Sequence, residues 1–139
     1  MTQHKLITAK DRKVMESNWT LSQVSERADS GLAEAAGRYS ALDEKPVIKL
    51  FDAWGQAFWL LVELEPTKEA KFHGDPVDMA FGLADLGLGF PELGYVSVDE
   101  LRGMRLGDGG PPRIERDLYF RAEKTLAEYL ADAKNGVRP

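Results

Sequence analysis

The sequence predicts an α+β fold: a twisted antiparallel sheet of about four strands, with an N-terminal and a C-terminal helix packed on it. Three features of the 139-residue chain support this prediction. Apolar residues alternate or run together in several short stretches bounded by Gly, Pro or Asp, as in β-strands. Apolar residues at helical spacing lie near both ends of the chain. A turn of only three residues separates the first two strands, which favours antiparallel pairing.

The N-terminal helix is predicted to begin at Thr8, whose hydroxyl can cap it, with Asp11 in the first turn, where the helix dipole favours an anion. Met15 and Trp19 are four residues apart and therefore lie on one side of this helix. Residues 20–45 follow no regular pattern. We expect them to form an irregular or weakly helical insertion.

Two strands are predicted next, over residues 47–52 and 56–65. The second strand is apolar on both faces at its middle, so we expect it to lie at the centre of the sheet with both faces covered. In the turn, Gly55 can adopt the left-handed conformation that a hairpin loop of this length commonly needs. Trp54, at the tip, either folds back over the sheet or stands exposed as an anchor for a binding partner.

A third strand is predicted over residues 77–84. One of its faces is bulky, whereas the other carries small residues, among them Ala80, Gly82 and Ala84. Small residues allow a helix or another backbone to approach closely. This strand should therefore pack tightly against a neighbouring element.

Residues 85–94 form an apolar loop of Gly, Leu, Phe and Pro, with acidic residues at Asp85 and Glu92. Its large apolar side chains would expose an extensive patch if the loop were free, so we expect most of them to be buried against the sheet or a helix. Asp85 and Glu92 should then face loop amides or Arg116. The glycines should supply backbone angles or clearance that other residues lack.

In the last third of the chain, the sequence predicts a short helix, then a strand, then a second helix. Ser97 and Glu100 form a capping box that starts a short helix. Residues 113–120 alternate between apolar and polar side chains, as in a strand with one solvated face. Residues 124–134 carry an apolar stripe at helical spacing and are followed by Asn135-Gly136, a stop signal. We expect the two terminal helices to cover one face of the sheet and residues 136–139 to be a frayed tail.

The length predicts a single domain over residues 1–139. The absence of cysteine excludes disulfides, thiolate catalysis and iron–sulfur clusters, and is compatible with a reducing cytoplasm. The N-terminus has no apolar core like that of a signal peptide, and the longest apolar run, residues 57–62, is far shorter than the roughly 18 residues that span a membrane. We therefore expect a cytoplasmic protein without membrane contact.

The net charge of −5 is unevenly distributed along the chain. Residues 63–100 carry nine acidic and two basic side chains, whereas the flanking segments are nearly balanced or basic. An acidic surface repels phosphate backbones, so nucleic-acid binding is not expected. The acidic segment is either a solvated face that aids solubility or a docking face for a basic partner.

No motif in the sequence indicates a cofactor or a metal, and we expect neither. Gly87-Leu88-Gly89 lacks the third glycine of a dinucleotide-binding loop, and a phosphate-binding Gly-Lys-Ser/Thr sequence is absent. His4 and His73 are the only histidines, and neither has a second ligand at helical spacing.

Carboxylates are the remaining chemical candidates. Asp85, Glu92, Glu115 and Asp117 would converge if the apolar loop folded over the predicted fourth strand, and paired carboxylates of this kind support hydrolysis. The alternative is that Asp85 and Glu92 bind loop amides and that one of them pairs with Arg116. No catalytic residue is assigned. The binding candidates are Trp54, Asp85, Phe90, Glu92, Arg116 and Asp117.

Several stretches of the chain match a known family: residues 46–51 (Pro-Val-Ile-Lys-Leu-Phe), 59–61 (Trp-Leu-Leu), 80–97 (Ala-Phe-Gly-Leu-Ala-Asp-Leu-Gly-Leu-Gly-Phe-Pro-Glu-Leu-Gly-Tyr-Val-Ser) and 114–120 (Ile-Glu-Arg-Asp-Leu-Tyr-Phe). Through them the sequence resembles a bacterial family named domain of unknown function 2958, over about residues 6–133. It departs from the family pattern in residues 20–45 and 68–75. The resemblance implies a small cytoplasmic bacterial protein, often encoded on plasmids or other mobile elements, and it implies no activity.

The function expected from these observations is a non-enzymatic interaction or modulator protein of the mobile-element type. It would dock a basic protein partner through its acidic face. The alternative is a small hydrolase or ligand-binding enzyme that uses carboxylates around residues 85–94. Converging polar side chains in a concave pocket would favour the enzyme, whereas an acidic face with an exposed aromatic residue would favour the interaction protein.

Overall fold

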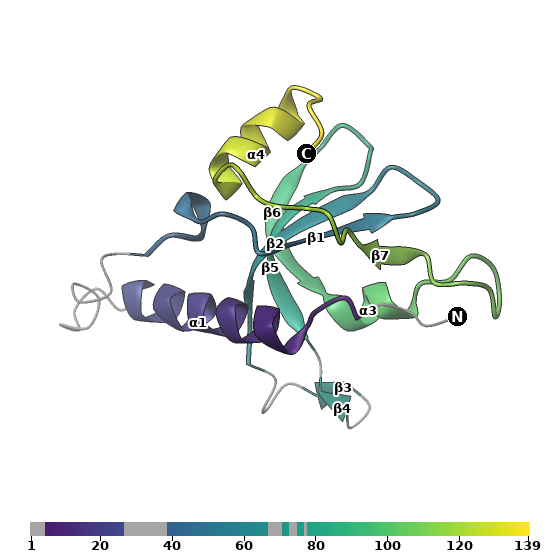
Figure 1. The fold of residues 1–139 in the computed structure, drawn as a ribbon, viewed down its shortest axis with the longest axis horizontal. Helices are drawn as coiled ribbons and strands as arrows, with labels where there is room; N and C mark the ends of the chain where they lie inside the picture. Colours follow the sequence, from purple (N-terminus) through teal and green to yellow (C-terminus); the bar gives the residue numbers. More distant parts are fainter. Residues whose placement is uncertain (1–4, 27–38, 67–70, 73–74, 77) are drawn as a thin grey trace.

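The computed structural model describes residues 5–26, 39–66, 71–72, 75–76 and 78–139. Its main sheet has five strands in the order β6-β5-β2-β1-β7, and all neighbouring pairs are antiparallel (Figure 1). The described elements are α1 (Ala9–Glu26), η1 (Ala41–Asp43), β1 (Ile48–Asp52), β2 (Phe58–Leu64), β3 (Lys71–Phe72), β4 (Asp75–Pro76), β5 (Met79–Asp85), β6 (Glu92–Ser97), α3 (Val98–Gly103), β7 (Ile114–Arg116) and α4 (Leu126–Lys134). The α+β prediction is confirmed, with five strands in the main sheet instead of about four; β3 and β4 form a separate two-stranded ribbon.

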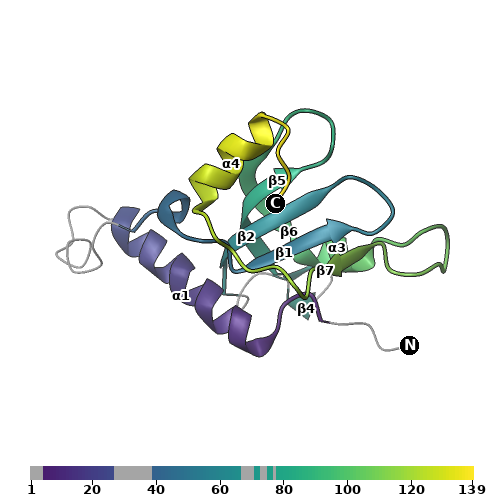
Figure 2. The same ribbon diagram turned by 45° about the horizontal axis from the view of Figure 1, so that its top comes forward.

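The terminal helices lie on opposite sides of the sheet (Figures 1 and 2). Met15 of α1 belongs to one buried apolar cluster, together with Ile48 and Trp59. Leu126 of α4 belongs to a second cluster, together with Phe58. The prediction that both helices cover one face is therefore wrong. The physical reason is the central strand, which is apolar on both faces and so requires a cover on each.

The strand β2 is central and buried along its whole length, as the sequence predicts. Its regular alternation is interrupted where the pairing register with β5 shifts between Leu61 and Glu63. A β-bulge of this kind adds one residue and reverses the alternation beyond it. Leu64 therefore joins the α1 cluster with Leu61, whereas simple alternation places it with Phe58 and Leu60. The side chain of Asn18 on α1 donates a hydrogen bond of 3.0 Å to the Val62 carbonyl at the bulge.

The start of α1 is capped as predicted. The Thr8 hydroxyl accepts a hydrogen bond from the Asp11 amide (3.2 Å), and the Asp11 carboxylate accepts from the hydroxyl and the amide of Thr8. The helix continues to Glu26 and thus includes the first part of residues 20–45, where irregular or weakly helical structure was expected. Residues 27–38 lie outside the described part of the chain.

Asp52, and not a left-handed glycine, shapes the turn between β1 and β2. Its carboxylate accepts a hydrogen bond from the Trp54 amide (2.9 Å) and forms an ion pair with Arg113 (2.8 Å). Gly55 is not among the glycines with positive φ, so the conformation expected for it is not observed. A side chain at Gly55 would instead collide with the Asp52 carboxylate, because an added Cβ would lie 2.7 Å from its oxygen.

The small-residue face of β5 does allow a close backbone approach, as predicted. A Cβ placed on Gly82 would lie only 2.0 Å from the carbonyl oxygen of Leu60 on β2. On its other side, Gly82 is paired with Gly94 of β6. The strand β6 was not predicted. Gly94 interrupts the alternation of side chains in residues 92–97, and the first residues of the strand were assigned to the preceding loop.

The strand predicted over residues 113–120 is shorter than expected and ends at Arg116. After it, the Asp117 carboxylate accepts a hydrogen bond from the Tyr119 amide (2.9 Å), and the Phe120 amide donates to the Asp117 carbonyl. These bonds make a turn, so the apolar–polar alternation beyond Arg116 does not reflect a strand.

The C-terminal helix α4 begins with a complete capping box between Thr125 and Glu128. Its buried residues are Leu126, Tyr129 and Ala133, which belong to the predicted stripe. The tail beyond it, expected to be frayed, contacts the sheet. Arg138 donates a hydrogen bond of 2.8 Å to the Gln56 carbonyl, and its guanidinium lies 5.1 Å from the centre of the Phe58 ring.

Candidate functional site

The apolar loop between β5 and β6 is exposed, contrary to the prediction that it is packed. The side chains of Leu86, Leu88 and Phe90 are 54%, 73% and 77% exposed. Gly87 and Gly89 both have positive φ, a conformation that only glycine adopts at low cost. Of the four large apolar residues in the loop segment, only Leu93 packs against a core cluster, because it already belongs to β6.

The turn between β1 and β2 lies against this loop. A Cβ placed on Gly87 would lie 2.6 Å from the Cβ of Gln56, so the two loops touch. Trp54, at the tip of the turn, is 57% exposed, which decides between the two positions expected for it. We call the exposed side chains of Trp54, Leu86, Leu88 and Phe90 the loop-end surface.

The four side chains of the loop-end surface together expose a considerable apolar area. A large aromatic side chain contributes about 150–250 Å² when it is wholly covered, so these four side chains, each more than half exposed, present on the order of 400 Å². This estimate lies within the roughly 300–600 Å² of the largest patch on a typical monomer, which is often functional. Both loops are held in shape: the Asp52 carboxylate accepts from the Trp54 amide, and the Asp85 carboxylate accepts from the Gly87 amide, each at 2.9 Å.

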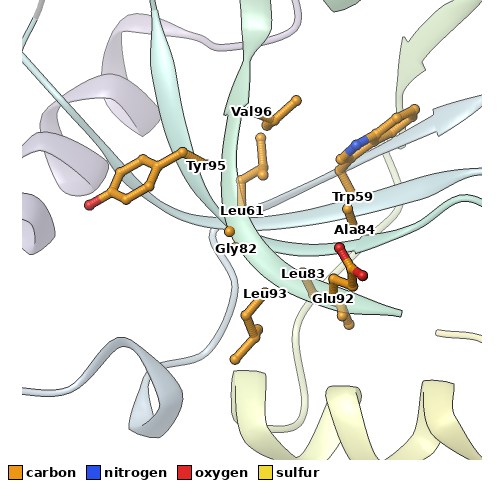
Figure 3. Close-up of a pocket in the computed structure, with 10 residues that line it drawn as sticks. Trp59, Leu61, Gly82, Leu83, Ala84, Glu92, Leu93, Tyr95 and Val96 are labelled. Atoms are coloured by element: carbon orange, nitrogen blue, oxygen red, sulfur yellow. The ribbon is translucent and has the colours of Figure 1, made fainter. Parts of the chain in front are cut away.

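A hollow of about 100 Å³ opens on the face of the sheet next to this surface (Figure 3). It arises because Gly82 and Gly94 face each other across β5 and β6 and leave no side chain above the sheet. Its other lining residues include Trp59, Leu61, Ala84 and Val96. Glu92 also lines it, and in the described part of the chain this exposed carboxylate has no hydrogen bond or ion pair. We call this feature the Glu92 hollow.

Arg116 and Asp117 lie at the opposite edge of the sheet from Asp85, Phe90 and Glu92, because β2 and β1 separate β5 from β7. Arg116 forms an ion pair with Asp11 and donates to the Leu6 carbonyl. Asp117 forms an ion pair with Lys49 (3.4 Å). The expected pairing of Arg116 with Asp85 or Glu92 is therefore wrong.

The four carboxylates considered for hydrolysis do not converge. Asp85 and Glu92 lie at the end of β5 and the start of β6, whereas Glu115 and Asp117 lie on and after β7. Two strands stand between these pairs. The arrangement that the hydrolase alternative requires is absent for these residues.

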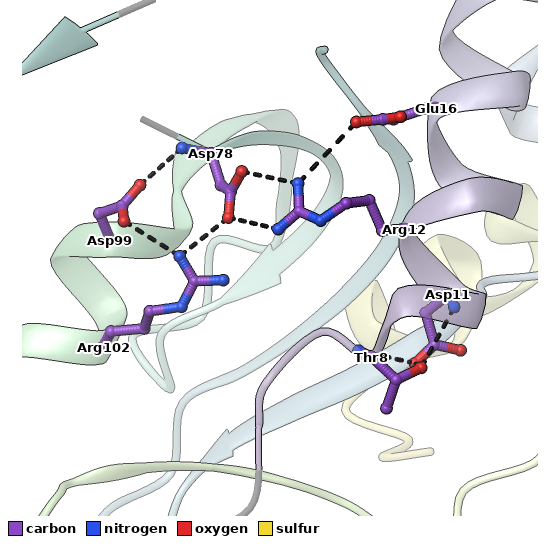
Figure 4. Close-up of polar contacts among 7 residues, drawn as sticks. All are labelled: Thr8, Asp11, Arg12, Glu16, Asp78, Asp99 and Arg102. Atoms are coloured by element: carbon purple, nitrogen blue, oxygen red, sulfur yellow. Dashed lines mark hydrogen bonds and ion pairs between the residues drawn. The ribbon is translucent and has the colours of Figure 1, made fainter. Parts of the chain in front are cut away.

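Asp78 is the centre of a buried ion cluster that joins α1, β5 and α3 (Figure 4). Its carboxylate binds both nitrogens of Arg12, at 2.9 and 2.8 Å, and Arg102 at 2.9 Å. Burial raises the pKa of Asp78, but hydrogen bonds and charge from the two arginines outweigh burial and hold this pKa below its ordinary value. The Asp99 carboxylate accepts from the Asp78 amide at 2.5 Å. Every group in the cluster is thus engaged in joining elements, which indicates a structural role.

Glu63 is the second buried acidic residue among those described. It lies beside Tyr39 in a hollow of about 440 Å³ between α1, η1 and the sheet. Burial raises the pKa of the Tyr39 phenol, and the neighbouring Glu63 carboxylate raises it further, so this tyrosine stays protonated. The sequence gives no sign of this pair, because Glu63 reaches its place through the β-bulge.

Two further classes of site are absent from the described part of the chain. It contains no group of three or more His, Cys, Asp or Glu side chains placed to hold a metal ion. It also contains no helix long and apolar enough to cross a membrane. His4 and His73 lie outside the described residues.

Comparison with known proteins identifies the family. The family model described as "Protein of unknown function (DUF2958)" matches residues 6–137, nearly the whole chain. The chain belongs to DUF2958. The resemblance seen in the sequence is thereby confirmed. No curated protein and no solved structure matches the chain. For this DUF2958 protein, the loop-end surface and the Glu92 hollow are the features of the described structure on which we base a functional proposal.

Proposed function

We propose that this DUF2958 protein is a non-enzymatic interaction module that binds a protein partner through the loop-end surface. The observation that carries the proposal is the exposure of four large apolar side chains at the tips of two touching loops. Tryptophan and large aromatic side chains in such positions are typical anchors of protein interfaces.

The size of the patch supports a stable contact. Covering on the order of 400 Å² of apolar surface is worth roughly 10 kcal/mol before the cost of association is subtracted. Each loop is fixed at one point before binding, since the Asp52 carboxylate accepts from the Trp54 amide and the Asp85 carboxylate accepts from the Gly87 amide. A preformed contact surface loses less entropy than a flexible one and therefore favours binding.

The charge near the patch supports a basic partner. Asp85 and Glu92 flank the β5–β6 loop, and this segment contains no lysine or arginine. Two arginines lie at the neighbouring β1–β2 turn, but both are engaged: Arg113 in an ion pair with Asp52 and Arg138 in a hydrogen bond to the Gln56 carbonyl. Complementary charge across an interface speeds association and excludes wrongly charged partners. The proposed partner is therefore a protein with an apolar contact surface and basic residues beside it.

The test is comparative capture from the source organism. The wild-type chain and the double variant Leu88→Ser, Phe90→Ser are immobilised, and bound proteins are quantified by mass spectrometry. Tyr119→Ser is the matched control, because Tyr119 is 93% exposed but follows β7 at the other edge of the sheet. Circular dichroism verifies that all three proteins are folded.

The proposal expects at least one protein whose capture falls about tenfold or more, as for the loss of an interface anchor, in the double variant but not in Tyr119→Ser. Binding of the purified candidate to the three chains then measures the dissociation constants directly. Equal capture by the double variant and the wild type would show that this surface is not the contact site.

A further inference from the structure

We propose that the Glu92 hollow receives a lysine or arginine side chain of the partner that covers the loop-end surface. This inference rests on the proposed function and adds to it the chemistry of one contact. Phe90 and Glu92 are two residues apart in the chain, so a partner lying over Phe90 comes close to the hollow that Glu92 lines.

The lining of the hollow matches the two parts of a long basic side chain. Its interior is apolar, with Trp59, Leu61 and Val96, which suits the methylene groups of lysine or arginine. The Glu92 carboxylate supplies the negative charge for an ammonium or guanidinium group. Because Glu92 is exposed and its carboxylate makes no hydrogen bond or ion pair with a described residue, this carboxylate is available without breaking an existing contact.

The size of the hollow indicates a single side chain. Sites for whole small molecules typically measure about 300–1,000 Å³, whereas this hollow has about 100 Å³. For comparison, a cavity of roughly 150 Å³ holds one benzene ring. The hollow therefore accommodates the stem of one side chain that enters from an adjacent protein.

A second copy of this chain is a poor occupant. In a symmetric pair, each copy would present the same surface to the other. The β5–β6 segment from Asp85 to Glu92 contains two acidic and no basic side chains, so a symmetric pair joined through these loops would bring Glu92 and Asp85 close to the same carboxylates of the other copy. The occupant must supply its own positive charge, which points to a different protein.

The test uses a phage-displayed library of random dodecapeptides panned against the folded wild-type chain. Peptides are retained if Phe90→Ser weakens their binding, which selects those at the loop-end surface. Their affinities are then measured by fluorescence anisotropy for wild type, Glu92→Gln and Gly94→Leu. Gly94→Leu fills the hollow and should fold, because no heavy atom lies within 4 Å of an added Cβ. Glu115→Gln, an exposed carboxylate on β7, is the matched control.

The expected peptides share a lysine or arginine next to apolar residues. Their affinity should fall roughly two- to fivefold in Glu92→Gln, the upper part of the range of an exposed ion pair, and should not change in Glu115→Gln. Replacing the basic residue of the peptide by alanine should weaken binding to wild type but cause no further loss with Glu92→Gln, because the two changes remove one interaction.

Three results would overturn the inference. Peptides that need Phe90 but lack a basic residue, and bind Glu92→Gln as well as wild type, would refute it and leave the proposed function intact. Peptides that are all indifferent to Phe90→Ser would refute the proposed function and this inference with it. Sedimentation showing a wild-type dimer that Gly94→Leu dissolves would make a second copy the occupant.

Discussion

Replacing Gly82 by alanine should destabilise the fold more than any other single methyl group added to the sheet. A Cβ at this position would lie 2.0 Å from the carbonyl oxygen of Leu60 and 2.8 Å from the Cα atom of Leu61. Both are backbone atoms of the central strand, so neither can move aside by rotating a side chain. Relief requires β2 and β5 to separate by about 1 Å or more, since favourable contacts between heavy atoms lie near 3.5–4.0 Å.

The magnitude follows from this displacement. Overpacking a core with a movable side chain costs about 1–3 kcal/mol, and here the collision is with backbone that carries the ladder between β2 and β5. Alanine is intrinsically better than glycine in a strand by roughly 0.5–1 kcal/mol, which offsets a small part. We expect a net loss of about 3 kcal/mol, a large share of the roughly 5–15 kcal/mol that stabilises a typical domain.

Gly94→Ala is the matched control, because Gly94 pairs directly with Gly82 and no heavy atom lies within 4 Å of its added Cβ. Its stability should be unchanged or increased by up to about 1 kcal/mol. Urea unfolding followed by tryptophan fluorescence measures both variants. If Gly82→Ala and Gly94→Ala agreed within about 0.5 kcal/mol, the close approach of β2 to Gly82 would be refuted. Failure of Gly82→Ala alone to fold would support it.

Three further predictions concern the core, the ion cluster and the exposed loop. Leu60→Ala should lower the free energy of unfolding by about 2–5 kcal/mol, because this side chain is fully buried; a loss below about 1 kcal/mol in urea would contradict a central position for β2. Asp78→Asn should cost about 2 kcal/mol near pH 7, where the carboxylate is ionised and bound by two arginines. Since the pKa of Asp78 is lowered in the folded state, its contribution is present above about pH 4 and is lost as the pH falls through the folded pKa. The stability difference between wild type and Asp78→Asn should therefore shrink in acid. A difference that grew below about pH 4 would contradict a lowered pKa of Asp78 in the folded state. In hydrogen exchange, the amides of residues 88–91 should exchange rapidly, while those of β2 stay protected. Slow exchange throughout the loop would contradict its exposure and support the packed arrangement expected from the sequence.

Local patterns determined the parts of the fold that depend on neighbours in the chain. The cap at Thr8, the cap that Ser97 makes by accepting from the Glu100 amide, and the stripe on α4 all follow from contacts between residues three or four apart. The central position of β2 follows from its apolar content on both faces, and the family follows from the long match around residues 80–97.

The tertiary structure alone decided where the exposed and the polar groups meet. The apolar composition of residues 86–90 predicts burial, yet the side chains of Leu86, Leu88 and Phe90 are exposed in a loop at the end of the sheet. Its neighbour is the β1–β2 turn, far away in sequence. The bulge in β2 likewise carries Leu64 to the other face. Burial depends on which segments the sheet order brings together, and strand order is a non-local property that the alternation of single strands does not contain.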